Sequence, residues 1–178
     1  RHFKRYLFWE CLVLFFVLPL VAALLKPRGW MYLLLWGMAL LSMYWLNHHK
    51  YDLNKIWNKQ AFNKVLLSSM LKLFMFLSVV LLIFTYLFIP ERLFSFPLER
   101  PAMWAMVMFC YPVLSVFPQE VIFRSFFFRR YVGLFDTPKC MIFVSALAFG
   151  WAHILLLNWI AVVFSFFGGL IFACSYHK

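Results

Sequence analysis

Three polar residues, Glu120, Arg124 and His153, lie inside otherwise apolar sequence. An isolated charge at the centre of a bilayer costs about 2.5 to 3.5 kcal/mol on insertion scales, so such residues usually face the interior of a helix bundle. Glu120 precedes Arg124 by four residues, which places both on one helix face and lets them neutralise each other. A carboxylate beside a buried histidine of an adjacent helix can hold and deprotonate a water molecule. The three residues therefore indicate a hydrolytic site, provided that helix packing brings them together.

Other roles for these residues stay open. A single histidine in an apolar helix is often a hydrogen-bonded contact between helices, and the helix alone favours that role for His153. Glu and His could also bind a metal ion, but they supply two ligands where a catalytic zinc normally has three from the protein. Water activation without a metal or cofactor fits better. The adjacent His48 and His49 and the four widely spaced cysteines form neither a metal-binding nor a disulfide pattern.

The composition predicts an integral membrane protein of the all-α class. Of the 178 residues, 66% are hydrophobic and only 13% are charged, which would leave a soluble domain covered with apolar surface. The formal net charge of +11 comes from basic residues at the ends of apolar segments rather than in one patch. That distribution indicates membrane topology, not a nucleic-acid partner. The expected partner is the lipid bilayer.

Apolar runs predict a polytopic bundle of about six transmembrane helices. A kink is expected at Pro112, and Pro118 is expected to end one span or to restart it as a new helix from Gln119 to Val132. The six expected spans cover residues 7–25, 30–46, 65–89, 102–117, 140–157 and 159–176.

Polar and small residues beside these runs carry further expectations. The stretch from Asn47 to Lys64 is expected to form an amphipathic helix on the membrane surface. Glu10, near the start of the first span, is expected to be an interfacial residue. In the last span, Gly168, Gly169 and Ala173 are expected to allow close approach of a neighbouring helix.

The distribution of basic residues predicts the orientation. With a cytoplasmic N-terminus, the basic residues outside the spans fall mainly on the cytoplasmic side, so we expect a multi-pass protein of the cell (inner) membrane with both termini inside. The sequence begins at Arg1 without an initiator Met and ends at Lys178 directly after an apolar run, so we expect residues 1–178 to be one transmembrane domain and a fragment of a larger bundle. The basic residues left on the other side are Lys26, Arg28, Arg92 and Arg100.

Two motifs resemble those of a known family. Gln119-Glu120-x-x-x-Arg124, followed about thirty residues later by Phe149-x-x-x-His153, is similar to the Glu-Glu-x-x-x-Arg and Phe-x-x-x-His motifs of the CAAX protease and bacteriocin-processing (CPBP, or Abi) family of intramembrane proteases. The motifs are individually weak, but their order, spacing and membrane setting together are fairly specific. The resemblance covers about residues 101–178, which would form a partial CPBP-type protease core.

The resemblance implies an all-helical, glutamic-type endopeptidase. On that interpretation Glu120 and His153 activate a water molecule inside a cytoplasm-facing cavity, and the water attacks a peptide bond near the membrane. Arg124 would pair with the carboxylate, and Phe149 would form part of the cavity wall. The substrate would be a membrane-associated peptide or protein, lipidated substrates included.

Two differences from the family pattern support an alternative. Gln119 stands where the family has its leading Glu, usually given the role of base, and an amide cannot take a proton. The later His-x-x-x-Asn motif, which supplies oxyanion contacts in the family, has no counterpart before Lys178. The alternative is a catalytically inactive relative that binds partners in the membrane, as in bacteriocin self-immunity. A transporter with a proton relay is a third hypothesis, which the sequence supports least because no inverted repeat is visible.

Overall fold

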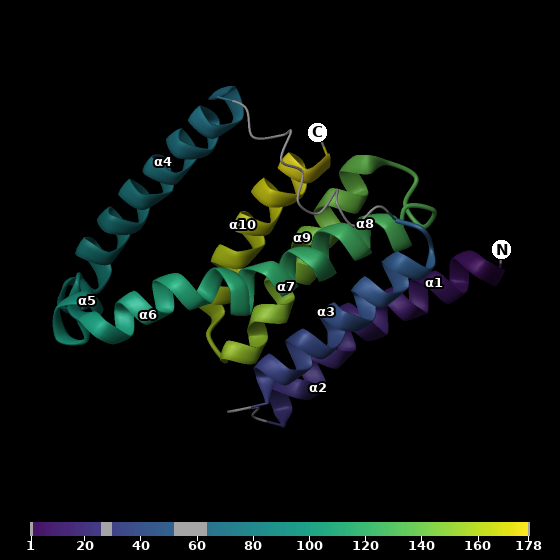
Figure 1. Cartoon of the computed structure of the whole chain (residues 1–178), viewed down its shortest axis with the longest axis horizontal. Coiled ribbons are helices and arrows are strands. Elements are labelled where there is room, and N and C mark those ends of the chain that lie inside the picture. Colours follow the sequence, from purple (N-terminus) through teal and green to yellow (C-terminus); the bar gives the residue numbers. More distant parts are fainter. Residues whose placement is uncertain (1, 26–29, 52–63, 178) are drawn as a thin grey trace. The chain divides into compact units, whose positions relative to one another are not determined.

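The computed structural model describes residues 2–25, 30–51 and 64–177, and all regular secondary structure in these residues is helical (Figure 1). Several long helices contain short π-helical turns, at Val13–Val17, Pro112–Val116 and Val121–Phe126. The α-helices are α1 His2–Leu12, α2 Leu18–Leu24, α3 Met31–His48, α4 Lys64–Phe88, α5 Ser95–Glu99, α6 Pro101–Tyr111, α7 Phe117–Glu120, α8 Phe127–Arg130, α9 Pro138–Ala152 and α10 Trp159–His177, and 3₁₀ turns lie at Pro90–Arg92 and His153–Leu156.

Backbone contacts divide the chain into two compact units. The first unit contains Arg1–Tyr51 and Leu114–Lys178, and the second contains Asp52–Val113. Both motifs, from Gln119 to His153, therefore lie in the first unit. The single transmembrane domain expected over residues 1–178 stays a prediction.

Five helical segments of the described chain are long and apolar enough to cross a membrane. A crossing needs about 20 predominantly apolar residues. The prediction of an all-α, polytopic membrane protein is therefore confirmed. The span expected at residues 30–46 forms α3, which ends in the polar Asn47 and His48 and is not among the five. The five segments are His2–Leu24, Leu71–Phe88, Pro101–Arg130, Pro138–Leu156 and Trp159–His177.

Some expectations fall outside the described residues. The surface helix expected between Asn47 and Lys64 is one of them, because residues 52–63 are not described, while Asn47 belongs to α3 and Lys64 begins α4. Basic residues that entered the expected orientation and are also not described are Arg1, Lys26, Arg28, Lys55, Lys59 and Lys178.

The prediction that Pro118 ends or restarts a helix is wrong. Residues Pro101–Arg130 are helical throughout. A proline inside a helix removes one N–H donor and leaves the carbonyl four residues earlier without its usual partner. That carbonyl belongs to Leu114, and the indole Nε1 of Trp36 in α3 donates a hydrogen bond to it over 3.0 Å. The π-helical turn at Pro112–Val116 also adjusts the hydrogen-bond ladder just before Pro118.

Helices α9 and α10 approach each other closely through small residues. A Cβ atom added at Gly150 would lie 2.8 Å from Cβ and 2.9 Å from Cα of Phe166. Gly169 is similarly close to α9, and Ala173 is fully buried, so the role expected for these two residues is confirmed. The expectation for Gly168 is wrong, because in the described residues a Cβ atom there would meet no atom of a neighbouring helix within 4 Å.

Glu10 forms an ion pair that the sequence did not predict. Arg130 donates from Nε to Oε1 of Glu10 over 2.8 Å and from Nη2 to Oε2 over 2.6 Å, and the Tyr131 hydroxyl donates to Oε1 over 3.0 Å. The Glu10 and Arg130 side chains are each 16% exposed. We call Glu10, Arg130 and Tyr131 the clasp. It joins α1 to the end of the helix that carries both Glu120 and Arg124.

Aromatic rings surround the clasp and continue into the core of the first unit. The guanidinium carbon of Arg130 lies 5.1 Å from the ring centre of Trp45 in α3 and 5.9 Å from that of Tyr6 in α1. Phe15, which is almost fully buried, makes edge contacts with Phe123, Phe127 and Tyr131 at ring-centre distances of 5.5, 5.1 and 5.9 Å. The N-terminal helix therefore packs over several turns along the continuous helix Pro101–Arg130, which carries Glu120 and Arg124 and which we call the motif helix.

Breaking the clasp on one side is expected to destabilise the protein. Glu10→Gln or Arg130→Gln should each lower the free energy of unfolding by about 2 kcal/mol, because each leaves a poorly hydrated charge without its partner. Removing both charges avoids that penalty, so the double variant should cost clearly less than the sum of the two single variants. Unfolding of the purified protein in mixed micelles with increasing dodecyl sulfate measures all three. Additive losses would show that the two side chains do not act as a pair.

Candidate active site

Arg124 is charged and almost completely buried, with 1% of its side chain exposed. Its Nε atom lies 3.9 Å from Oε2 of Glu120, so the ion pair predicted from the four-residue spacing is confirmed. Its other contacts are long, from Nη1 to the Phe123 carbonyl oxygen over 3.4 Å and from Nη2 to the Gly169 carbonyl oxygen over 3.5 Å. Within the described part of the chain, Nε has no hydrogen-bond partner. The guanidinium is thus compensated in charge but only weakly hydrogen-bonded.

Glu120 differs from Arg124 in its exposure. Its side chain is 39% exposed, although it lies one turn before a buried arginine on the same helix. No donor hydrogen bonds to its carboxylate among the residues that the structure describes, and Arg124 is too distant at 3.9 Å to do so. Both oxygens therefore remain available as acceptors.

Phe149 connects the first motif to the second. Its ring lies beneath the Arg124 guanidinium, with 5.0 Å between the guanidinium carbon and the ring centre, a distance suited to a cation–π interaction. The same ring makes edge contacts with Phe123 at 5.3 Å and with His153 at 4.9 Å between ring centres. A single buried ring of α9 thus touches the arginine of one motif and the histidine of the other. Its place in a cavity wall stays a prediction.

His153 lies where α9 passes into the 3₁₀ turn His153–Leu156, and its side chain is half-buried. The Nδ1 atom is 2.8 Å from the carbonyl oxygen of Phe149. Because a carbonyl oxygen can only accept, Nδ1 must carry the hydrogen in this contact. The neutral ring then presents Nε2 as a hydrogen-bond acceptor. This tautomer is the one that can hold a water molecule through its hydrogen.

Glu120 and His153, which were predicted to lie together, are connected through other side chains. No hydrogen bond or ion pair joins these two side chains in the described residues, and the connection runs from Glu120 through Arg124 and the Phe149 ring. Gln119 points to a different partner, since its Nε2 donates over 2.9 Å to the hydroxyl of the buried Ser115 one turn earlier. A direct Glu120 to His153 contact stays a prediction.

Comparison with known families decides the identity of this part of the chain. Residues 101–178 match the family model described as "Type II CAAX prenyl endopeptidase Rce1-like". This segment is similar to the Rce1-like family. The matched residues are those over which the two motifs resembled the CPBP proteases, so that resemblance is confirmed. Searches of curated proteins and of solved structures found no match.

The Rce1-like segment depends on two contacts that sequence reasoning missed. Gly169 supplies the carbonyl oxygen nearest to Nη2 of Arg124, and a Cβ atom there would lie 3.1 Å from Cδ1 of Phe149. The buried Ser145 hydroxyl donates to the Phe123 carbonyl oxygen over 2.9 Å and so ties α9 to the motif helix. The Gly168-Gly169 pair predicted close packing, but nothing in the sequence indicated that the Gly169 carbonyl oxygen would lie next to Arg124.

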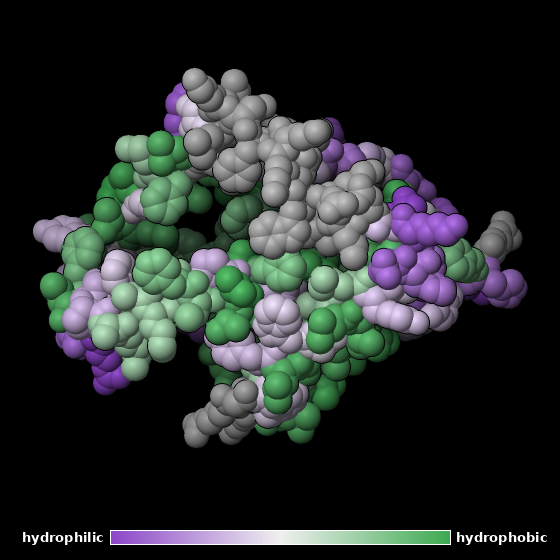
Figure 2. All heavy atoms as spheres, viewed as in Figure 1, coloured by the Kyte–Doolittle hydropathy of each residue, from purple (hydrophilic) through white to green (hydrophobic). Residues whose placement is uncertain are grey.

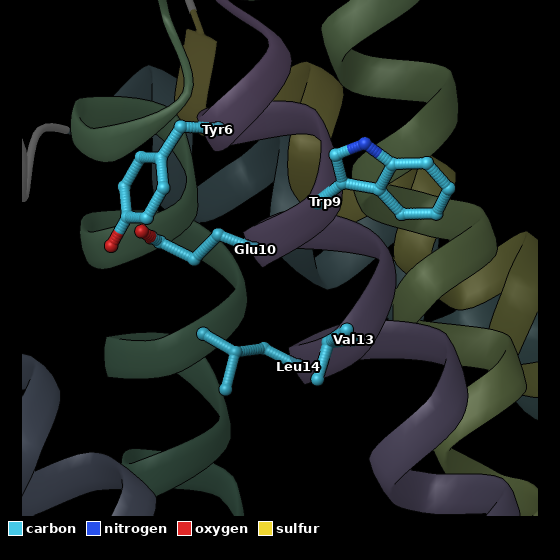
Figure 3. Close-up of a pocket in the computed structure, with 5 residues that line it drawn as sticks. All are labelled: Tyr6, Trp9, Glu10, Val13 and Leu14. Atoms are coloured by element: carbon cyan, nitrogen blue, oxygen red, sulfur yellow. The ribbon is translucent and has the colours of Figure 1, made fainter. Parts of the chain in front are cut away.

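The described residues offer no cluster of metal ligands, and a hollow lies beside the N-terminal helix. No group of three or more His, Cys, Asp and Glu side chains in those residues is arranged to hold a metal ion. A shallow hollow of about 390 Å³ opens beside the clasp in the first unit rather than beside Glu120 or His153 (Figure 3). Tyr6 and Glu10 point toward each other at its edge, and the residues that line it are Tyr6, Trp9, Glu10, Val13 and Leu14.

Proposed function

We propose that this chain is a glutamic-type intramembrane endopeptidase that hydrolyses a peptide bond with a water molecule activated by Glu120 and His153. One observation carries the proposal. The Phe149 ring contacts both Arg124 and His153, and so links the Glu-x-x-x-Arg and Phe-x-x-x-His motifs inside a segment that is similar to the Rce1-like family.

Each side chain has a distinct part in the proposed reaction. Glu120 accepts a proton from the water, whose oxygen then bonds to the carbonyl carbon of the peptide; the proton passes to the nitrogen that leaves as the C–N bond breaks. Neutral His153, protonated at Nδ1, accepts the second hydrogen of the water at Nε2 and orients it. Arg124 places a positive charge 3.9 Å from the Glu120 carboxylate without occupying its oxygens. Phe149 fixes the direction of the imidazole.

The proposed substrate and orientation follow from the family name and the charge pattern. A CAAX prenyl endopeptidase acts on a tail with a lipid-modified cysteine, so we take a membrane-associated, lipidated peptide as the first substrate class for this chain. The excess of basic residues on one side supports a multi-pass protein of the cell (inner) membrane with both termini and the site on the cytoplasmic side.

Gln119 is the observation that favours a second candidate, an inactive family member that binds partners in the membrane. The experiment that separates the two candidates uses the full chain in phosphatidylcholine vesicles with a farnesylated peptide that ends in a C-a-a-X sequence. Mass spectrometry detects the released tripeptide. We expect cleavage by the native chain, and at least tenfold faster cleavage by Gln119→Glu, because a second carboxylate can serve as base.

The Gln119→Glu substitution is well matched to its site. Ser115 can donate its hydroxyl hydrogen to a carboxylate as readily as it accepts from the present amide, so the local geometry should be kept. The variant Glu99→Gln, at an exposed residue of the second unit, controls for general effects of carboxylate number. No tripeptide from either the native chain or Gln119→Glu would contradict the protease and favour the inactive binding protein.

A further inference from the structure

Four helix ends meet on one side of the first unit: the starts of α1 and α9 and the ends of α3 and α8 (Figure 1). Two sets of contacts hold them together. Lys4 of α1 lies 3.4 Å from Asp136 in the loop before α9, measured from Nζ to Oδ1. Arg130 at the end of α8 lies over the rings of Tyr6 in α1 and Trp45 in α3. Basic residues next to these contacts therefore lie on one surface.

Some of these basic residues have no acidic partner. Arg5, Lys50, Arg129 and Lys139 are all exposed, and none forms an ion pair with another described residue. We call these four residues the basic surface. Figure 2 shows hydrophilic residues gathered on the same side of the first unit, in contrast to the mainly hydrophobic remainder of that unit's visible face. The surface thus carries four positive charges that nothing in the described structure compensates.

The basic surface lies at the level where lipid headgroups are expected. Arg5 is in the first turns of the span His2–Leu24, Arg129 is in the last turn of Pro101–Arg130, and Lys139 is in the first turn of Pro138–Leu156. Lys50 follows the end of α3 by two residues. Span ends of this kind meet the phosphates of the bilayer, and each Lys or Arg near an anionic surface strengthens association about fivefold. We propose that the basic surface binds the phosphate groups of anionic phospholipids.

Adjacent arginines provide an internal comparison. Arg130 turns inward and gives its hydrogen bonds to Glu10, whereas Arg129 is exposed and unpaired. If the surface binds lipid phosphate, Arg129→Gln should weaken the preference for anionic lipid and leave stability unchanged. Arg130→Gln should lower stability and leave the lipid preference in place, provided that the measurement is made under conditions where the variant is folded.

The test places the full chain in phosphatidylcholine vesicles with a trace of spin-labelled phosphatidylglycerol or spin-labelled phosphatidylcholine. The ratio of their immobilised fractions gives the preference for anionic lipid. We expect the native chain to prefer phosphatidylglycerol, the preference to fall with added salt, and Arg129→Gln to reduce it about fivefold. A variant with Gln at all four positions of the basic surface should show no preference. Circular dichroism confirms its helix content.

Exposed arginines of the second unit supply the matched control. Arg92→Gln with Arg100→Gln removes two basic residues from a turn that also contains Glu91 and Glu99 and so has no net positive charge to attract anionic lipid; the preference should stay within twofold of the native value. A full preference in the fourfold variant, or an equal loss in the control, would overturn the proposal. So would displacement of phosphatidylglycerol by inorganic phosphate at an ionic strength at which chloride has no effect, because that result identifies a site for free phosphate. The readout does not require proteolysis, so it is independent of the proposed peptidase.

Discussion

Glu120→Gln is expected to lower the rate of peptide-bond hydrolysis by the full chain at least a hundredfold. Glutamine keeps the size of the side chain but removes both the negative charge and the proton acceptor, and general-base catalysis typically contributes about 10² to 10⁴ in rate. The initial rate of tripeptide release from the farnesylated peptide measures the effect. His153→Gln should lose a similar factor, because the water would no longer be held at Nε2.

The double variant sharpens this prediction. If Glu120 and His153 act on the same water molecule, Glu120→Gln with His153→Gln should be little slower than either single variant, as for catalytic residues that work as a unit. Glu120→Gln also leaves the buried Arg124 without its counter-charge, so the unfolding of each variant must be followed beside its activity. Undiminished hydrolysis in a folded Glu120→Gln protein would remove Glu120 from the mechanism.

Gly150→Leu is expected to destabilise the first unit by at least about 3 kcal/mol. The first atom of any side chain at this position would lie within 3.0 Å of Cβ, Cα and the backbone nitrogen of Phe166, and a backbone cannot move aside as a flexible side chain can. Helices α9 and α10 would have to separate, and forcing extra atoms into a packed interface typically costs 1–3 kcal/mol even for single methylenes. Unfolding in mixed micelles with dodecyl sulfate measures the loss.

Gly168→Leu is the matched control, because it makes the same substitution in α10 instead of α9. A Cβ atom at Gly168 has open space within 4 Å, so the leucine should be accommodated and stability should stay within about 1 kcal/mol of the native protein. The same comparison tests activity, because α9 carries Phe149 and leads directly into the 3₁₀ turn that begins at His153. Equal losses in the two variants would show that leucine is disfavoured by something other than the α9 to α10 contact.

Features that depend on local sequence could be predicted. Apolar runs predicted five of the six expected membrane spans, and the four-residue spacing predicted the pair of Glu120 and Arg124. Both predictions rest on the helix period and on the cost of placing polar groups in lipid. These can be judged from the sequence of one segment, without knowing how the segment packs against others.

Features that depend on packing between distant segments could not be predicted. Glu10 and Arg130 are 120 residues apart, so neither position indicates the other, and a carboxylate near a span end suggested the interface instead. The Leu114 carbonyl oxygen, which Pro118 leaves without its helical donor, accepts instead from the indole of Trp36, 78 residues earlier. The contact of Gly150 with Phe166 likewise appears only when α9 and α10 are side by side.

The clasp limits how far residues 101–178 can be separated from the N-terminal helices of this protein. A segment cut at Pro101, where the Rce1-like match begins, would keep Arg130 and Tyr131 but lose the carboxylate of Glu10. The mostly buried arginine would then lack its counter-charge, which is costly. A chimera that joins residues 101–178 to the N-terminal half of another protein should therefore insert and fold only if its new partner offers an acidic side chain in the place of Glu10.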